Sequence, residues 1–332
     1  MNNRTITIGA VAIVALAAIF YFASSQKKVS EDIKVGILLG FTGPIESLTP
    51  DMASGAELAF NEASNSGELL GGSKITILRA DSTCVDSAAA TAAAEDLLSQ
   101  GMTAMMGADC SGVTGAVATN VAVPNGFVMI SPSATSPGLT DLEDKGMFFR
   151  TAPSDARGGQ VLADITNDKG IKSVAITYVN SDYGLGLADV YKAAVEAYGI
   201  TVTTMASHES DKADYSADVG VLSSAGGDAL AVLGYLDNAG GHIIEGSLDS
   251  GAFDTFVLSD GMIGDSLTDR FGSDLNNSFG SMPGSLGEGA QLFKSVAEAG
   301  GINASVYVGE SYDAAALICL LYTSDAADDS LR

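Results

Sequence analysis

The stretch "TAMMGADCSGVTG", residues 103–115, contains the unit from which this fold is built. Its first part, 103–108, is a short apolar run of the kind that forms a buried strand. The segment that follows, 112–123, is predicted to be a helix, and small polar residues lie between the two. A strand that passes through a small polar loop into a helix is typical of a parallel α/β sheet.

The same unit recurs on both sides of this stretch. Strands are predicted at 33–40, 74–80, 103–108 and 126–131, and helices at 49–63, 86–101 and 112–123. Pro50 is typical of a first helical turn, while Asp86 and Gly101 are typical of the two ends of a helix. This alternation predicts a parallel sheet with helices on both of its faces.

The pattern then restarts, which predicts a second lobe of the same class. A strand at 172–179 is followed by a helix at 183–199, and the alternation continues through 201–207, 215–226, 228–235, 238–251 and 254–260. The extended, Pro-broken segment 145–159 is expected to cross between the lobes. The fold class is therefore α/β, with two Rossmann-like lobes of parallel sheet joined by hinge crossovers.

Four regions are expected along the chain. Residues 1–25 form a signal peptide or membrane anchor, 33–150 plus 278–318 form the first lobe, 151–277 form the second lobe, and 319–332 form a tail. The tail has no apolar stripe beyond its first three residues, so we interpret it as a non-native truncation scar. On that interpretation the C-terminus is truncated; the alternative is a genuine disordered acidic tail.

The N-terminus predicts export. A short positive start, "MNNR", precedes the charge-free run 6–23, and Ala23 and Ser25 are the small residues that a signal peptidase prefers. The run is also long enough for an uncleaved anchor. In either case the body of the protein is expected in the periplasm, where disulfides are permissible.

Composition argues against several classes of partner. Sixteen Lys and Arg against 41 Asp and Glu give a net charge of −25, which repels nucleic acid and anionic lipid. The two histidines, His208 and His242, have no context of a catalytic base, and motifs for nucleotide phosphates or zinc are absent. We therefore expect no enzyme activity, no catalytic residue, no metal and no cofactor.

Polar loops follow several predicted strands, where ligands bind in open α/β sheets. The loop after the third strand contains Cys110 and Ser111, and "SPSATSPGLTD" follows the fourth. Hydroxyls and free N–H groups of a helix start can hold a carboxylate, although the same residues also serve as ordinary caps. From these patterns alone Cys110 could be a nucleophile, a metal ligand, a buried thiol or half of a disulfide.

The second lobe offers three further polar candidates after its strands: Tyr183, Tyr235 and Asp260. A tyrosine supplies a flat apolar face with one hydroxyl, and an aspartate supplies the fixed negative charge that an ammonium needs. The alternatives are tyrosines at the edge of the core and a helix cap for Asp260.

Taken in order, these motifs resemble the branched-chain amino-acid binding proteins, the type I solute-binding proteins of ABC importers. The resemblance runs from Ile33 to Ile318 and rests on the motifs "IKVGILLGFTGP", "GAELAFNEAS", "ADSTCVD", "MGADCSG", "ISPSATSPGLTD", "FFRTAPSD", "NSDYGLGL", "GYLDNAGG" and "SYDAAAL". It implies a type I periplasmic binding protein fold and a disulfide between Cys84 and Cys110. It also implies amino-acid transport through a cleft that closes about a hinge.

The resemblance further implies a ligand site in the first lobe. Ser111 and Thr135 would donate hydroxyls to the α-carboxylate of the ligand, with the backbone of Ser133 and Ala134 beside it. Leu48 stands where the best-known members have a tyrosine, which changes the pocket for the ligand's side chain.

In the second lobe, Tyr183 and Tyr235 match ligand contacts of that family. Asp260 aligns with a glutamate that pairs with the α-ammonium, and it is one methylene shorter. We therefore expect a monomeric solute-binding protein that takes an amino acid or a similar small amide or carboxylate and delivers it to a membrane permease. The alternative is a ligand-sensing receptor module of the same bilobal fold, anchored by its N-terminus.

Overall fold

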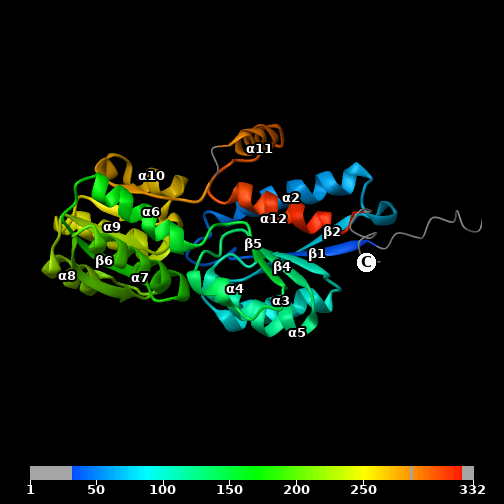
Figure 1. Ribbon diagram of the computed structural model, residues 1–332, viewed down its shortest axis with the longest axis horizontal. Helices are drawn as coiled ribbons and strands as arrows, with labels where there is room; N and C mark the ends of the chain where they lie inside the picture. Colours follow the sequence, from blue (N-terminus) through cyan, green and yellow to red (C-terminus); the bar gives the residue numbers. More distant parts are fainter. Residues whose placement is uncertain (1–31, 285–286, 324–332) are drawn as a thin grey trace, which may run out of the picture.

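The computed structural model describes residues 32–284 and 287–323, which form two α/β lobes (Figure 1). The first lobe contains a five-stranded parallel sheet in the order β2-β1-β3-β4-β5. Its strands are β1 (Ile33–Leu39), β2 (Ile75–Asp81), β3 (Ala104–Gly107), β4 (Val128–Ser131) and β5 (Phe148–Arg150). Because β1 is central and covered on both faces, it is almost wholly apolar and its last five residues are buried.

The second lobe repeats this architecture with the order β10-β9-β8-β6-β7, again all parallel. Its strands are β6 (Ser173–Val179), β7 (Thr201–His208), β8 (Ala229–Leu233), β9 (Phe256–Leu258) and β10 (Phe279–Gly280). The predicted fold class, with two lobes of parallel sheet, is therefore confirmed.

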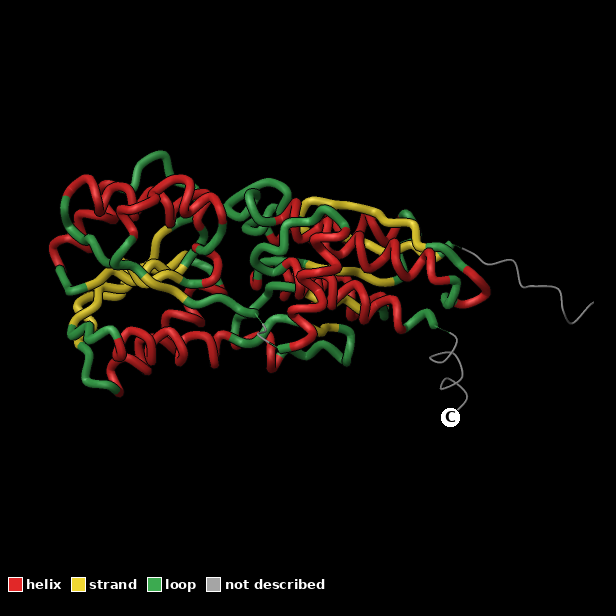
Figure 2. The backbone as a smooth tube through the Cα atoms, turned by 90° about the horizontal axis from the view of Figure 1, so that it is seen from above, coloured by secondary structure: helices red, strands yellow, loops and turns green. Residues whose placement is uncertain are grey.

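Helices cover both faces of each sheet, as the alternating pattern predicts; Figure 1 shows this for the first lobe and Figure 2 for the second. The first lobe has α2 (Thr49–Ser66) beside α12 (Val308–Leu320) on one face, with α3 (Ser87–Ser99), α4 (Ser111–Val117) and α5 (Val123–Asn125) on the other. The second has α6 (Asp155–Asp168) packed on α7 (Asp182–Ala197), and α8 (Ser216–Ala225) packed on α9 (Gly241–Ser250), followed by α10 (Asp265–Phe271). Helix α11 (Glu288–Ala299) lies over α12, where Phe293 contacts Tyr312.

Short turns complete the list of elements. The 3-10 turns are η1 (Leu70–Gly72), η3 (Pro137–Asp141), η5 (Asp260–Met262) and η6 (Gly272–Leu275), and the π turns are η2 (Ala118–Ala122) and η4 (Leu236–Gly240). Caps follow the expected residues: the carboxylate of Asp86 accepts hydrogen bonds from the backbone N–H groups of Ala88 and Ala89 at the start of α3.

The end of β3 depends on a glycine. Gly107 has a φ of +124°, and a Cβ atom there would lie 2.2 Å from the carbonyl oxygen of Leu38 on the neighbouring strand. Only glycine fits such a close approach at this φ. This bend carries the chain from β3 into the loop of Asp109, Cys110 and Ser111 at the carboxyl end of the sheet.

The structure differs from the expected lobe boundaries at one place. Phe279 and Gly280 pair with Val257 and Leu258 of β9, so this part of 278–318 lies in the second sheet rather than the first lobe. The reason is that the chain adds one more parallel strand to the second sheet before it returns to α12. The division into domains otherwise remains a prediction.

The two ends of the chain lie mostly outside the described residues. The predicted signal or anchor at 1–25 falls there, and so does most of the tail. Within the described part, no helix is both long and apolar enough to cross a membrane. Helix α12 extends to Leu320, and the carbonyl oxygen of Tyr322 accepts a hydrogen bond from the N–H of Leu70, so the first residues of 319–332 pack on the first lobe.

The predicted disulfide is confirmed. Cys84, in the loop after β2, is bonded to Cys110, in the loop after β3, with 5.1 Å between their Cα atoms. Both are buried, and the third cysteine, Cys319, is a buried free thiol on α12. The alternatives of a nucleophile, a metal ligand or a free thiol at Cys110 are thereby excluded.

Removing this bond tests its contribution to stability. The double variant Cys84→Ala/Cys110→Ala should unfold with a free energy about 3 kcal/mol lower than the wild type, because closing the intervening loop no longer restricts the unfolded chain. Urea unfolding measures the difference, and Cys319→Ala serves as the control that leaves the bond intact. An unchanged denaturation midpoint in the double variant would contradict this account.

Candidate functional site

A narrow cavity lies between the lobes, where loops that follow strands of both sheets meet. Its volume is about 20 Å³, room for roughly one water molecule. The first lobe contributes Ile45, Leu48, Met52, Asp109, Cys110, Ser111 and Ser133, the segment before α12 contributes Tyr307, and the second lobe contributes Tyr183, Tyr235, Asp260 and Gly261. We call this cavity the cleft.

The structure brings together most of the residues singled out from the sequence. Ser111, Ser133, Tyr183, Tyr235 and Asp260 all line the cleft. Two others do not line the cleft: Ala134, 0% exposed, and Thr135, 1% exposed, are buried in the loop that continues from Ser133. The hydroxyl oxygen of Thr135 has no hydrogen-bond partner within the described part of the chain.

Asp260 lies at the centre of this arrangement, in the turn η5 after β9. Its side chain accepts hydrogen bonds from the hydroxyl of Tyr183, at 2.6 Å, and from the hydroxyl of Tyr307. Burial raises the pKa of Asp260, while the two tyrosine hydroxyls oppose this shift. Because Tyr307 precedes α12 of the first lobe, the carboxylate joins the two lobes directly.

The tyrosines form a rigid wall. The rings of Tyr183 and Tyr235 are stacked, with 5.1 Å between their centroids and 20° between their planes. Burial and the carboxylate of Asp260 together raise the pKa of Tyr183 well above its ordinary value. Tyr183 therefore stays a neutral donor, which suits it to hold a carboxylate in place.

Asp155 is a second buried carboxylate, and the sequence reasoning did not single it out. It is the first residue of α6 and only 5% exposed, and its Oδ2 has no hydrogen-bond partner within the described residues. Burial, and then the charge of Asp260, raise its pKa well above the ordinary value, while the Thr135 side chain and the charge of Arg150 oppose this shift. Its backbone N–H donates to the carbonyl of Thr135, which anchors it beside the first-lobe loop.

Tyr307 was also missed. It has a left-handed backbone with a φ of +65°, it is 4% exposed, and it lies far along the chain from the other residues of the cleft. A tyrosine with this conformation is uncommon in proteins, which points to a constraint at this position. Tyr307 directly precedes α12, and no other feature of the sequence pointed to its role.

Hydrogen bonds fix the polar groups of the first lobe. The hydroxyl of Ser111 accepts from the backbone N–H of Ser136 at 3.0 Å, so its own hydrogen remains available for another acceptor. The hydroxyl of Ser133 donates to the carbonyl of Asp109. The Asp109 carboxylate accepts from Ser82 and from the backbone N–H groups of Gly40 and Cys110, and it therefore supports the loop.

The rim of the cleft is closed by direct contacts between the lobes. The N–H of Ser47 donates to a carboxylate oxygen of Asp237 at 2.8 Å, and the hydroxyl of Ser136 donates to the carbonyl of Asp182 at 3.0 Å. On α7, a Cβ atom added to Gly186 would lie 3.0 Å from a ring carbon of Pro137. A side chain at this position would press against the first lobe, so the two lobes approach each other closely here.

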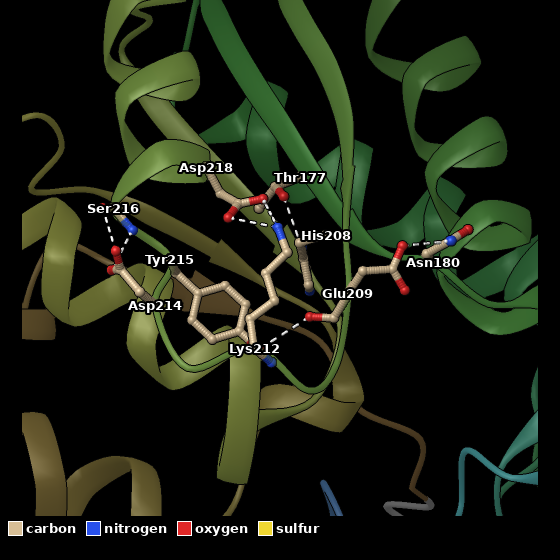
Figure 3. A network of polar contacts seen from close by, with 9 residues as sticks. All are labelled: Thr177, Asn180, His208, Glu209, Lys212, Asp214, Tyr215, Ser216 and Asp218. Atoms are coloured by element: carbon tan, nitrogen blue, oxygen red, sulfur yellow. Dashed lines mark hydrogen bonds and ion pairs between the residues drawn. The ribbon is translucent and has the colours of Figure 1, made fainter.

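A separate polar network lies on the second lobe around β7 and α8 (Figure 3). Lys212 forms an ion pair with Asp218 at 2.9 Å, and Thr177 and His208 share a hydrogen bond of 2.8 Å. Burial lowers the pKa of His208 to about 4, so this imidazole is neutral at pH 7. Thr177 on β6 and His208 at the end of β7 are each 1% exposed, so this pair lies in the interior of the second lobe.

The described residues hold no cluster of three or more His, Cys, Asp or Glu side chains with the geometry of a metal site. The cleft instead combines hydroxyl donors on its first-lobe side, a tyrosine wall and the buried carboxylates of Asp109 and Asp260, while Asp155 lines a neighbouring cavity that shares Asp260. Such a set of groups suits a small solute that carries both an acceptor and a cation.

Comparison with known proteins identifies the family of this chain. Residues 32–314 match the model of a family described as "Periplasmic binding protein". The chain is 32% identical to a Leu/Ile/Val-binding protein homolog 3 of Brucella melitensis over 255 residues, or 74% of this chain and 64% of that protein, so it spans less than two thirds of that relative. It is 31% identical to a homolog 1 of the same species over 294 residues, or 86% of this chain and 76% of that protein.

Solved structures share the fold. The substrate-binding protein LivJ of Streptococcus pneumoniae, in complex with isoleucine, superposes with a TM-score of 0.75 at 24% identity, covering 88% of this chain and 84% of that one. A solute-binding protein of R. palustris in complex with 4-hydroxybenzoate superposes with a TM-score of 0.72 at 18% identity, covering 87% and 80%.

The unpartnered carboxylate of Asp155 should reduce stability. Since burial raises its pKa, the folded protein retains a proton that the unfolded chain loses near pH 4, and the free energy of unfolding falls as pH rises through that interval. Asp155→Asn should therefore stabilise the protein by about 0.5–2 kcal/mol at pH 7, as substitutions at functional sites often do. The difference should shrink towards pH 4.

Urea unfolding at a series of pH values measures this difference. Asp168→Asn is the matched control, because it removes an exposed carboxylate from the other end of α6. A loss of stability in Asp155→Asn at pH 7, or a gain that does not depend on pH, would contradict the account.

Proposed function

Because the chain belongs to the periplasmic binding protein family, we propose that it captures a small solute bearing an amine and a carboxylate between its lobes. It would then present this solute to the membrane permease of an ABC importer, as an exported monomer that catalyses no covalent chemistry. The observation that carries the proposal is Asp260, a buried carboxylate at the junction of the lobes that is held by two tyrosine hydroxyls.

In this proposal each end of the solute has its own partners. Asp260 takes the ammonium, because a buried carboxylate is a strong acceptor for a charged donor. The hydroxyls of Ser111 and Thr135 take the carboxylate, beside the backbone of Ser133 and Ala134. Two features support this assignment: the hydroxyl oxygen of Thr135 is buried without a partner, and that of Ser111 is held in place by Ser136.

The remaining residues of the cleft would shape its apolar part. Tyr183 and Tyr235 present their stacked faces, and Leu48 and Met52 lie opposite on the first lobe. Since the cleft has room for about one water molecule, a solute enters only when the lobes separate about the hinge. Contacts of the bound solute with both lobes then stabilise the closed arrangement.

Binding measurements on the full chain test the role of Asp260. A thermal-shift panel of amino acids, short amides, urea and aromatic acids identifies the ligand, and calorimetry gives its Kd. Asp260→Ala should raise that Kd about 10- to 100-fold, since a hydrogen bond to a charged group contributes roughly 1.5–3 kcal/mol.

Asp254→Ala is the matched control, because Asp254 is an exposed aspartate just before β9 of the same lobe. Equal Kd values for Asp260→Ala and the wild type would refute the ammonium role. So would a panel in which every amino acid fails and a compound without an amine binds.

Closure of the lobes can be tested with substitutions at the rim, outside the residues that line the cleft. Gly186→Leu places a side chain against Pro137 and Ser136 across the rim, whereas Gly220→Leu on α8 points into open space. Overpacking costs about 1–3 kcal/mol, so Gly186→Leu should weaken binding about tenfold, while Gly220→Leu leaves the Kd unchanged. Equal affinities in the two variants would show that binding does not require this approach of the lobes.

A further inference from the structure

A second cavity adjoins the cleft on its hinge side and shares Asp260 with it. It lies between the start of α6, helix α7 and the segment 281–284 that follows β10, and its volume is about 180 Å³. An apolar cavity of about 150 Å³ is known to hold benzene, so this space accommodates a group of about six heavy atoms. We call it the hinge-side cavity.

Two buried carboxylates line this cavity. Asp155 contributes an oxygen that has no hydrogen-bond partner within the described residues, and it is 5% exposed. Asp260 is 7% exposed and receives only neutral tyrosine donors from side chains. Their negative charges act on each other, as the effect of Asp260 on the pKa of Asp155 shows.

Neighbouring cations do not neutralise this pair. The positive charge of Arg150 lowers the pKa of Asp155. The hydrogen bonds of its guanidinium, however, go to the carbonyls of Ala134 and Ser136 and to the hydroxyl of Thr140. Arg157 also lines the cavity, but it is an exposed residue whose charge is screened by solvent. The Thr135 side chain also lowers the pKa of Asp155, but it is uncharged. A buried carboxylate oxygen without a hydrogen-bond partner is costly unless a ligand supplies the missing donor.

Part of the remaining wall suits a hydrocarbon chain. Val161 and Leu162 of α6, Leu187 of α7 and Met282 line the cavity, together with the serines Ser154, Ser259 and Ser281. A group that fits here therefore has an apolar stem and a cationic end. A primary ammonium on a short alkyl chain meets both requirements, since it brings donors for the carboxylates and methylenes for the wall.

We propose that the hinge-side cavity is a second ligand subsite, which receives an alkylammonium arm through Asp155, so that the solute is a diamino compound of the basic amino-acid class. This inference rests on the proposed function, because the arm is attached to a solute whose α-amino end lies on Asp260. It narrows the solute from amino acids in general to those with a second amine.

Calorimetry with ligands that differ only in the second amine tests the proposal. Lysine and norleucine share a six-carbon chain, and lysine carries an ammonium on the terminal carbon where norleucine carries only hydrogen. Ornithine is one methylene shorter than lysine, and its terminal ammonium stands where norleucine has its methyl group. The wild-type chain should bind lysine or ornithine at least tenfold more tightly than norleucine. Asp155→Asn should abolish this preference and leave the Kd of norleucine within twofold, while Asp168→Asn should retain the preference.

The outcomes separate the two proposals. If amino acids bind through Asp260 but norleucine equals or exceeds lysine and ornithine, the subsite is refuted and the function stands. If Asp155→Asn weakens all three amino acids equally, the subsite is also refuted. If 1,4-diaminobutane binds in a manner that depends on Asp155 while every α-amino acid fails, the subsite stands and the amino-acid function fails. If none of these compounds binds, both proposals fail.

Discussion

The arrangement of the two lobes depends on a carboxylate that is buried where they meet. Asp260 belongs to the second lobe, yet one of its two tyrosine donors, Tyr307, precedes the last helix of the first lobe. The carboxylate thus links the lobes, and it keeps a buried negative charge at their junction. Asp155 adds a second buried carboxylate at this junction, and the charges of the two carboxylates act on each other. A cationic solute would offset this negative charge.

The fold brings these groups together because both sheets are parallel. All strands of such a sheet end at the same edge, so the loops after β3 and β4 lie side by side and face the loops after β6, β8 and β9. Gly107 lets the chain turn sharply after β3, and the bond between Cys84 and Cys110 ties this loop to its neighbour. The hydroxyl of Ser111 is positioned by this local scaffold.

The sequence predicted the lobes and the alternation of elements, because apolar runs and capping residues act over short distances. The disulfide was implied by the resemblance to the branched-chain amino-acid binding proteins. The sequence also led to Ser111, Ser133, Tyr183, Tyr235 and Asp260, which follow strands and which the structure gathers around one cleft. Asp155 resembles an ordinary residue of a first helical turn, and Tyr307 reaches the cleft only through a left-handed backbone. Their roles depend on contacts between distant segments, as does the pairing of β10 with the second sheet.

A crystal structure of the full chain with the tightest-binding amine would test the central claim most directly. The account predicts that the solute lies between the lobes, with an ammonium nitrogen within hydrogen-bond distance of the Asp260 carboxylate. A solute held elsewhere, for example in the surface groove between α8 and α9, would contradict it. So would a solute in the cleft that turns its carboxylate towards Asp260.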